Sequence, residues 1–284
     1  VSTAVDAAEP VGRHSEQQAA QCKLTIIGGQ NDRLQQASMS CTGTTKPTVR
    51  LNPKYLGTFQ SKFTGVKLAA SCQSQAIDEA FCLMTICSGS LVLRDSRVSL
   101  VRDTPLDSLL CVLHESMLEV HNSVFSDNQA TPLFVSDQAS MVLHASNVSN
   151  NAAKGGGGGL WVQDNASVTI TGSSRVHRNR AVESSGGVHV RGNARLVVAG
   201  GSSISNNRAG WDGGALHITG NSTVTITGGS IVQGNTANLG GGGLAALKNA
   251  SLTITGSIVA NNTANTGGGG VFAQDTANVV ITSS

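Results

Sequence analysis

One short phrase recurs six times along this chain, an apolar residue followed three places later by asparagine. The last five copies are 27 or 28 residues apart, and only the first interval, of 23 residues, is shorter. A repeat of this length indicates one supersecondary unit stacked on itself, so that each unit contacts its neighbours only. The spacing therefore predicts a solenoid and excludes a globule with a single central core. The six asparagines are Asn128, Asn151, Asn179, Asn207, Asn235 and Asn262.

The residues between these phrases alternate between apolar and exposed types, as in VTIT at 168–171 and 224–227. This period of two predicts a half-buried strand. A second short strand holds the apolar residue of the asparagine phrase, and a third follows the glycines, as at 160–162 and 188–190. Three strands in about 28 residues are typical of a parallel β-helix. Because crossovers between parallel strands are right-handed, we expect an all-β, right-handed parallel β-helix.

Two residue types mark the corners of the predicted coil. Glycine runs at 155–159, 186–187, 213–214, 240–243 and 267–270 predict one corner where neighbouring coils approach too closely for a Cβ atom. The six asparagines predict another corner, at which their side chains stack about 4.8 Å apart and bond to each other and to turn backbone. The asparagines are therefore interpreted as a structural ladder.

Two phrases resemble the passenger repeats of the polymorphic outer membrane proteins of chlamydiae. These are the glycine phrase at 213–216, GGAL, and the asparagine phrase at 125–128, FSDN. The resemblance covers roughly residues 117–284, although five of the six asparagine phrases carry Val or Ile in place of Phe. It implies a right-handed β-helical body and an adhesive role at a cell surface.

The chain divides into three regions in sequence. Residues 1–21 are polar and are expected to form a cap or arm over the first rung. Residues 22–116 are interpreted as irregular coils of the same helix, with strands near 24–26, 49–51, 66–68 and 91–93 and an inserted loop at 41–62. Residues 117–284 form the regular repeats, which we expect to continue beyond the given C-terminus because residues 278–284 open a fresh repeat.

Cysteines and sequons both indicate an oxidising, extracellular or cell-surface location. The six cysteines precede residue 112 and lack CxxC spacing, so two or three disulfides are expected to staple the early coils. Five N-x-S/T triplets are candidates for glycosylation. The cysteines are Cys22, Cys41, Cys72, Cys82, Cys87 and Cys111, and the sequon asparagines are Asn147, Asn165, Asn221, Asn249 and Asn261.

An enzyme is the main rival, because many right-handed β-helices are polysaccharide lyases or hydrolases. From residue 150 onward there are only four carboxylates, Asp164, Glu183, Asp212 and Asp275, and no two share a column on adjacent coils. A glycosidase pair must lie within about 5–9.5 Å, and a calcium-dependent lyase needs several acids around one ion. We therefore predict no catalytic residues, no metal and no cofactor.

One outward column of the third strands is the predicted partner face. It carries Trp161, His189, His217 and Phe272, in a chain with 3% aromatic residues. Exposed aromatic rings commonly anchor sugars or other proteins; contact with a neighbouring loop is the alternative. Arg180 and Arg208 also align one repeat apart, and stacked like charges favour an acidic ligand between them; solvated arginines that splay apart are the alternative.

The sequence thus predicts a surface or extracellular structural and adhesive protein that acts through protein or glycan contacts. Its expected partners are surface or matrix proteins and acidic glycans, and the chain is expected to belong to a homo- or hetero-assembly. The net charge of +2 gives no basis for a nucleic-acid partner, and no apolar stretch reaches the roughly 18 residues of a membrane span. A carbohydrate-binding module and a polysaccharide lyase or hydrolase remain the alternatives.

Overall fold

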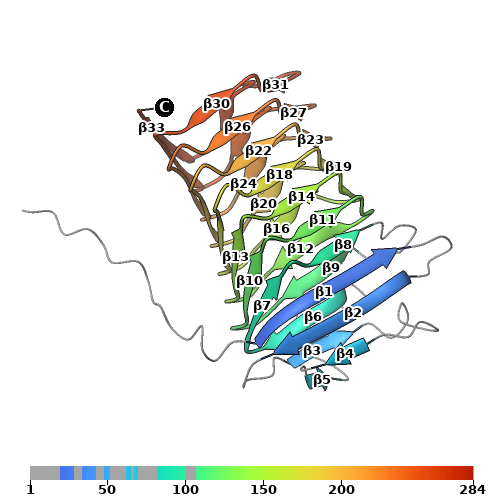
Figure 1. Cartoon of the computed structure of the whole chain (residues 1–284). Coiled ribbons are helices and arrows are strands. Elements are labelled where there is room, and N and C mark those ends of the chain that lie inside the picture. Colours follow the sequence, from blue (N-terminus) through green and yellow to red (C-terminus); the bar gives the residue numbers. More distant parts are fainter. Residues whose placement is uncertain are drawn as a thin grey trace, which may run out of the picture.

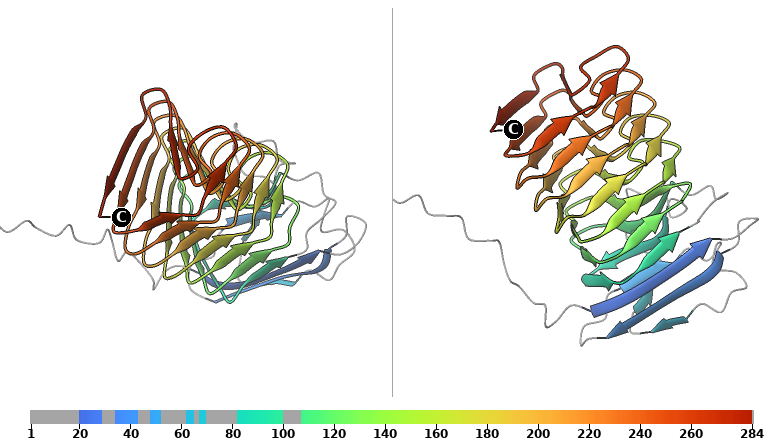
Figure 2. Two further views of the ribbon diagram at one scale, coloured as in Figure 1. Left: turned by 90° about the horizontal axis from the view of Figure 1, so that it is seen from above. Right: turned by 45° about the horizontal axis from the view of Figure 1, so that its top comes forward.

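The computed structural model is a stack of parallel β-coils, and it describes residues 20–28, 34–42, 48–51, 62–64, 67–69, 82–99 and 107–283. About seven coils of about 27 residues each follow one another without a helix in these ranges, which confirms the predicted all-β parallel β-helix. Figure 1 shows the coils rising from the early strands to the C-terminal one, and in the left view of Figure 2 successive coils lie over one another. The described residues form no helix with the length and apolarity of a membrane span.

Three long walls and one short wall surround the core, each a parallel ladder in which a strand pairs with the equivalent strand of the next coil. The first wall is β7 (Ser90–Arg94), β10 (Met117–His121), β13 (Ser140–His144), β17 (Ser167–Thr171), β21 (Arg195–Val198), β25 (Thr223–Ile226), β29 (Ser251–Thr255) and β33 (Asn278–Thr282). The second wall is β8 (Arg97–Ser99), β11 (Val124–Ser126), β14 (Asn147–Ser149), β18 (Arg175–His177), β22 (Ser203–Ser205), β26 (Ile231–Gln233) and β30 (Ile258–Ala260).

The third wall follows the glycine corner in each regular coil. It is β6 (Cys82–Ser88), β9 (Ser108–Val112), β12 (Thr131–Val135), β16 (Leu160–Val162), β20 (Val188–Val190), β24 (Leu216–Ile218), β28 (Leu244–Ala246) and β32 (Val271–Ala273). A short wall of two-residue strands, which the sequence pattern did not predict, lies between the asparagine and glycine corners. It is β15 (Ala152–Ala153), β19 (Arg180–Ala181), β23 (Arg208–Ala209), β27 (Thr236–Ala237) and β31 (Thr263–Ala264).

Alternation along the first wall builds the core, as predicted. In β17, Val168 and Ile170 are fully buried, whereas Thr169 between them is half-buried on the outside. The same two positions are fully buried in the next three coils, at Leu196, Val198, Val224, Ile226, Leu252 and Ile254. Each Å² of apolar surface removed from water stabilises the fold by about 25 cal/mol. Because every coil adds to this continuous apolar column, the column is the main source of stability.

The asparagine column forms a hydrogen-bonded ladder inside the second corner. The side-chain nitrogen of Asn179 donates to Asn207 Oδ1 at 3.1 Å and to the backbone oxygen of Val148 at 2.9 Å. The backbone N–H of Asn179 also donates to Asn207 Oδ1, at 2.9 Å. The same side-chain bond runs from Asn128 through Asn151, Asn207 and Asn235 to Asn262. Each interior amide thus meets its full hydrogen-bonding capacity while buried.

The N-terminal region differs from the predicted irregular coils. Strands β1 (Ala20–Gly28) and β2 (Leu34–Thr42) form an antiparallel hairpin, and β1 pairs in parallel with β7 and β8. Strand β3 (Thr48–Leu51) coincides with the strand predicted near 49–51, although it lies inside the segment interpreted as an inserted loop, and it pairs antiparallel with β6. Strands β4 (Lys62–Thr64) and β5 (Lys67–Ala69) pair with β2 and β3. The hairpin, drawn in blue in Figure 1, therefore covers the first rungs; of the expected cap, residues 1–19 lie outside the described ranges.

A serine column joins this hairpin to the coils. The backbone N–H of Leu24 donates to Ser96 Oγ at 2.9 Å, and the N–H of Ser96 donates in turn to Ser123 Oγ at 3.0 Å. The pattern continues from Ser123 to Ser146 and from Ser146 to Ser174. Leu24 is itself buried, so the hairpin takes the place of one more coil in both backbone pairing and core packing.

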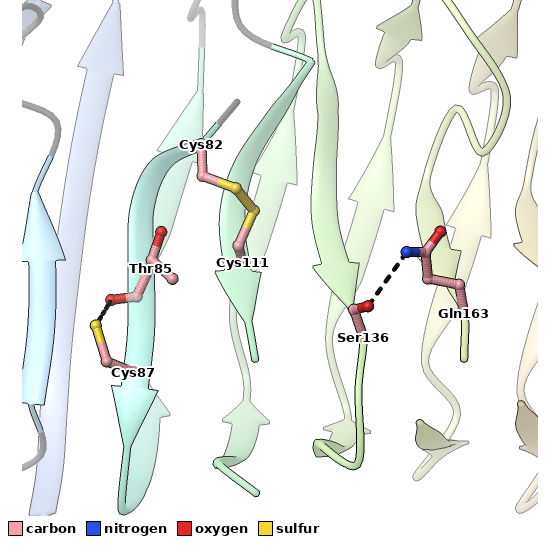
Figure 3. The surroundings of a disulfide bond; sticks show 6 residues. All are labelled: Cys82, Thr85, Cys87, Cys111, Ser136 and Gln163. Carbon is pink, nitrogen blue, oxygen red and sulfur yellow. Dashed lines mark hydrogen bonds between the residues drawn. A yellow bond between two sulfur atoms is a disulfide. The ribbon is translucent and has the colours of Figure 1, made fainter. Parts of the chain in front are cut away.

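A disulfide joins two early rungs of the third wall. Cys82 of β6 and Cys111 of β9 are bonded across 29 residues of sequence (Figure 3). Cys87 is also disulfide-bonded. The backbone register places Cys22 of β1 opposite Cys41 of β2, but the side chains of these two residues and all of Cys72 lie outside the described part. The bond between Cys82 and Cys111 agrees with the expectation that disulfides staple the early coils.

Candidate partner-binding surface

The predicted partner column is continuous along the third wall. Register places Trp161, His189, His217, Ala245 and Phe272 on successive strands, with Phe134 and Cys111 before them. The indole of Trp161 stacks on the imidazole of His189 with ring centroids 4.7 Å apart, and His189 lies 4.8 Å from His217. The predicted alignment of rings is therefore present.

The glycine corner covers part of this column, which corrects the prediction that the column is an exposed face. His189 and His217 are each only 8% exposed, and Trp161 and Phe272 are half-buried. A Cβ atom added to Gly156 would lie 3.0 Å from His189 Nδ1, and one added to Gly240 would lie 2.7 Å from the Phe272 ring. The glycines thus allow the backbone to lie against the rings, and the rings pack the corner onto the wall.

Burial makes the two imidazoles poor bases. The pKa of His189 is lowered to about 3, chiefly by burial and then by the positive charges of His217 and Arg191, against an opposing effect of the Ser184 backbone. The pKa of His217 is lowered to about 4 by burial, with Asp212 raising it and Lys248 lowering it. Neither Nδ1 atom has a hydrogen-bond partner. Both rings are neutral at pH 7, and the described residues bring no three His, Cys, Asp or Glu side chains together around a metal position.

The two predicted arginines lie on a different wall from the rings. Arg180 of β19 and Arg208 of β23 are direct register partners in the short wall, and both are exposed. Arg175 and Arg178 are exposed on the same coil as Arg180. His177, between those two, has its pKa lowered by burial and then by Arg178 and Arg175, which indicates a positive potential at this corner. The six predicted residues therefore do not form one face.

An apolar ridge that the sequence pattern did not predict lies next to the arginine pair. Val182 is 58% exposed, Trp211 is 50% exposed and Leu239 is 45% exposed. The Trp211 N–H donates to Glu183 O at 3.0 Å, and the Leu239 N–H donates to Trp211 O at 2.9 Å. The three side chains therefore lie on consecutive coils. We call Val182, Trp211 and Leu239 the Trp211 ridge. In sequence, Val182 follows Arg180 by two residues and Trp211 follows Arg208 by three.

The carboxylates near these surfaces have local structural partners. Asp212 Oδ1 accepts a bond from the backbone N–H of Gly240 at 2.7 Å, and Asp275 Oδ2 accepts one from Lys248 N–H at 3.1 Å. Asp164 accepts bonds from Ser136 and from Gln163, the second at 3.1 Å; the bond from Gln163 Nε2 to Ser136 appears in Figure 3. These contacts fix turns between adjacent coils.

The sequon asparagines occupy unlike environments. Asn165, Asn221 and Asn249 are exposed and, with Asn193, form a second asparagine ladder with side-chain bonds of 3.1 Å. Asn261 is exposed at a corner, where its φ is 54°. The Oδ1 atom of Asn147 is buried without a hydrogen-bond partner. Four of the five candidate sites are therefore at the surface, and whether any carries a glycan stays a prediction.

Residues 108–213 match a protein family described as a right handed beta helix region. The match supports a right-handed parallel β-solenoid. It includes the arginine pair and, of the ridge, Val182 and Trp211. No curated protein and no solved structure gives a significant match. The β-helix fold is compatible with adhesive, glycan-binding and pectate-lyase-like roles, so any choice among them depends on the surface.

Proposed function

We propose that this protein is an extracellular or cell-surface structural and adhesive β-helix, and that it holds its partner at the Trp211 ridge. The observation that carries the proposal is the exposure of Trp211 next to exposed Leu239 on the following coil. On the preceding coil, exposed Val182 is adjacent in sequence to Glu183, whose backbone bonds Trp211. Indole rings are among the side chains that most often dominate binding energy, and contiguous exposed apolar groups are typical of contact surfaces.

The architecture supports this role. Parallel ladders and the buried asparagines hold the ridge residues on a rigid frame, so little side-chain and loop ordering is needed when a partner binds. The resemblance to the chlamydial passenger repeats also favours an adhesin. A carbohydrate-binding module is the second candidate, and the exposed arginine pair next to Trp211 is the observation that favours it.

The proposal is tested by adhesion of the purified chain to immobilised matrix proteins, glycans and cell surfaces. The double variant Trp211→Ala/Leu239→Ala should lose most of the adhesion, because it removes both neighbouring anchors, while thermal unfolding stays unchanged. The control is Ile258→Ala, which truncates an apolar side chain that is 53% exposed on the second wall. Equal adhesion by the double variant, the control and the wild type would overturn the proposal.

A further inference from the structure

We infer that Arg180, Arg208 and Trp211 form a binding site for an acidic glycan chain, with the anionic groups at the arginines and a sugar ring on the indole. This rests on the proposed function, since it names the ligand class of the same ridge. The three residues come from two consecutive coils, β19 with its following turn and β23 with its following turn.

The arginine pair is the anion-binding half of the site. Arg180 and Arg208 are Cα partners in a parallel ladder, so their side chains leave the wall about 4.8 Å apart. The other residues of this column are Ala152, Thr236 and Thr263, which carry no charge. Like charges directly opposite each other are unfavourable in a sheet. A sulfate or carboxylate between the guanidinium groups would turn this repulsion into two charge-assisted hydrogen bonds.

Neighbouring charges on the same coil reinforce this half of the site. Arg175 and Arg178 are exposed just before Arg180, and both lower the pKa of His177. The coil at 175–180 therefore carries three arginines and no carboxylate. An anion at the pair would be attracted by this wider positive potential, which falls off over about 8–10 Å at physiological ionic strength.

Trp211 supplies the apolar half. Its indole is half exposed, and it follows Arg208 by three residues. The flat indole face offers apolar area at a low entropic cost, which suits the C–H face of a sugar ring. Coils about 4.8 Å apart are spaced by roughly the length of one sugar unit. A glycan running along the stack could therefore present successive units to successive coils.

Two carboxylates determine the orientation of the ligand. Glu183 and Asp212 are both half-buried beside the ridge, and the backbone carbonyl oxygen of Glu183, not its carboxylate, accepts the backbone N–H of Trp211. Asp212 Oδ1 already accepts a hydrogen bond from the backbone N–H of Gly240. Negative groups of the ligand are repelled from this side and attracted to the arginines, while sugar hydroxyls can donate to Glu183. This combination favours a glycan, with both anionic groups and hydroxyls, over an acidic peptide.

Binding of the whole chain to immobilised probes tests the inference. The probes are dextran sulfate, polygalacturonate, uncharged dextran and polyglutamate. Dextran sulfate or polygalacturonate should bind at least about tenfold more tightly than the other two probes. Arg180→Gln/Arg208→Gln and Trp211→Ala should each weaken that binding about tenfold, because each removes one half of the site. Glu183→Gln should strengthen it, since a repelling charge is lost.

The control double variant is Arg195→Gln/Lys248→Gln, which removes the same net charge from exposed residues elsewhere. It should change the affinity less than about threefold. An equal loss in the two double variants would show general attraction of polyanions and overturn the inference, as would undiminished binding by Trp211→Ala. Tighter binding of polyglutamate than of either acidic polysaccharide would overturn the inference and indicate that the ligand is an acidic peptide. If adhesion is lost in Trp211→Ala but binding of every glycan probe is unchanged in Arg180→Gln/Arg208→Gln, the glycan inference fails and the proposed function stands.

Discussion

His189 stacks on Trp161 at a centroid distance of 4.7 Å beneath the glycine corner, and its Nδ1 atom has no hydrogen-bond partner. His217 continues the stack on the next coil in the same state. Two neutral imidazoles are thus part of the packing that holds the corner to the third wall. This makes the stability of the corner sensitive to acid.

Acidification should destabilise the chain through these two residues. Their folded-state pKa values, about 3 and about 4, lie below the ordinary 6.5, so the unfolded chain binds protons first as the pH falls. The stabilising effect is complete above about pH 6.5, declines progressively as the pH falls below that value, and is fully lost once the pH has fallen through the folded-state values. At pH 5 the expected loss is about 2 kcal/mol for each imidazole.

Thermal unfolding between pH 7 and pH 4 measures this effect. The double variant His189→Phe/His217→Phe removes both titrating groups. Phenylalanine suits this column, since Phe134 and Phe272 already occupy two of its positions. Its unfolding midpoint should fall less with acid than that of the wild type. Parallel curves for the two proteins would contradict the assignment.

The buried and exposed asparagine ladders should differ in their contribution to stability. Asn207→Ala leaves Asn179 without the acceptor for both its backbone N–H and its side-chain nitrogen, in a buried position. Each buried unsatisfied group costs about 1–3 kcal/mol, so a loss of roughly 3 kcal/mol or more is expected. Asn221→Ala breaks two equivalent bonds at the surface, where water replaces them, and should cost less than about 1 kcal/mol. Urea unfolding of both variants measures the loss in the free energy of unfolding. Equal losses would argue against the view that the buried ladder stabilises the fold more than the exposed one.

Two glycines of the covering corner should respond oppositely to alanine. A Cβ at Gly186 would lie 2.4 Å from the backbone nitrogen of Arg208, which cannot move without distorting β23. Overpacking of this kind costs about 1–3 kcal/mol, and the displaced Arg208 should also weaken partner binding. A Cβ at Gly155 would meet only the Trp161 ring, at an ordinary 3.7 Å, so Gly155→Ala should be neutral or slightly stabilising. Calorimetric midpoints of the two variants decide the point, and a stable, fully binding Gly186→Ala would refute the close packing.

The Cys82–Cys111 bond should stabilise the early coils selectively. Closing 29 residues removes chain entropy worth about 3.5 kcal/mol from the unfolded state. Since each coil contacts only its neighbours, Cys82→Ala/Cys111→Ala should raise amide exchange in β6 and β9 and leave β28 and β32 unchanged. A uniform rise along the whole chain would mean that the coils unfold as one unit.

Much of the fold followed from the sequence because its signals repeat. The asparagine spacing, the alternation at positions such as Val168 and Ile170, and the glycine runs each recur on coil after coil, so a local pattern became a global one. The hairpin of β1 and β2 has no such period. Its antiparallel pairing depends on contacts with β7 and β8 of the first coil, and spacing alone carries no information about those contacts.

The partner surface was harder to predict because exposure depends on a loop. Alternation correctly placed Trp161 and His189 on the outward side of their strands, but it could not show that the glycine corner turns back over them. Trp211 was overlooked because it lies in that turn, where no alternation applies. Its one available signal was size: equivalent positions on other coils hold Gly155, Glu183, Leu239 and Thr266, so the indole is the largest side chain in that column and its only aromatic one.

Hydrogen exchange of the intact chain with and without dextran sulfate tests the location of the partner surface most directly. The account predicts slower exchange at 180–183, 208–212 and 236–240, where the arginine pair and the Trp211 ridge lie, and unchanged exchange along the first wall. Protection confined to the first wall, or none at these three turns, would contradict it.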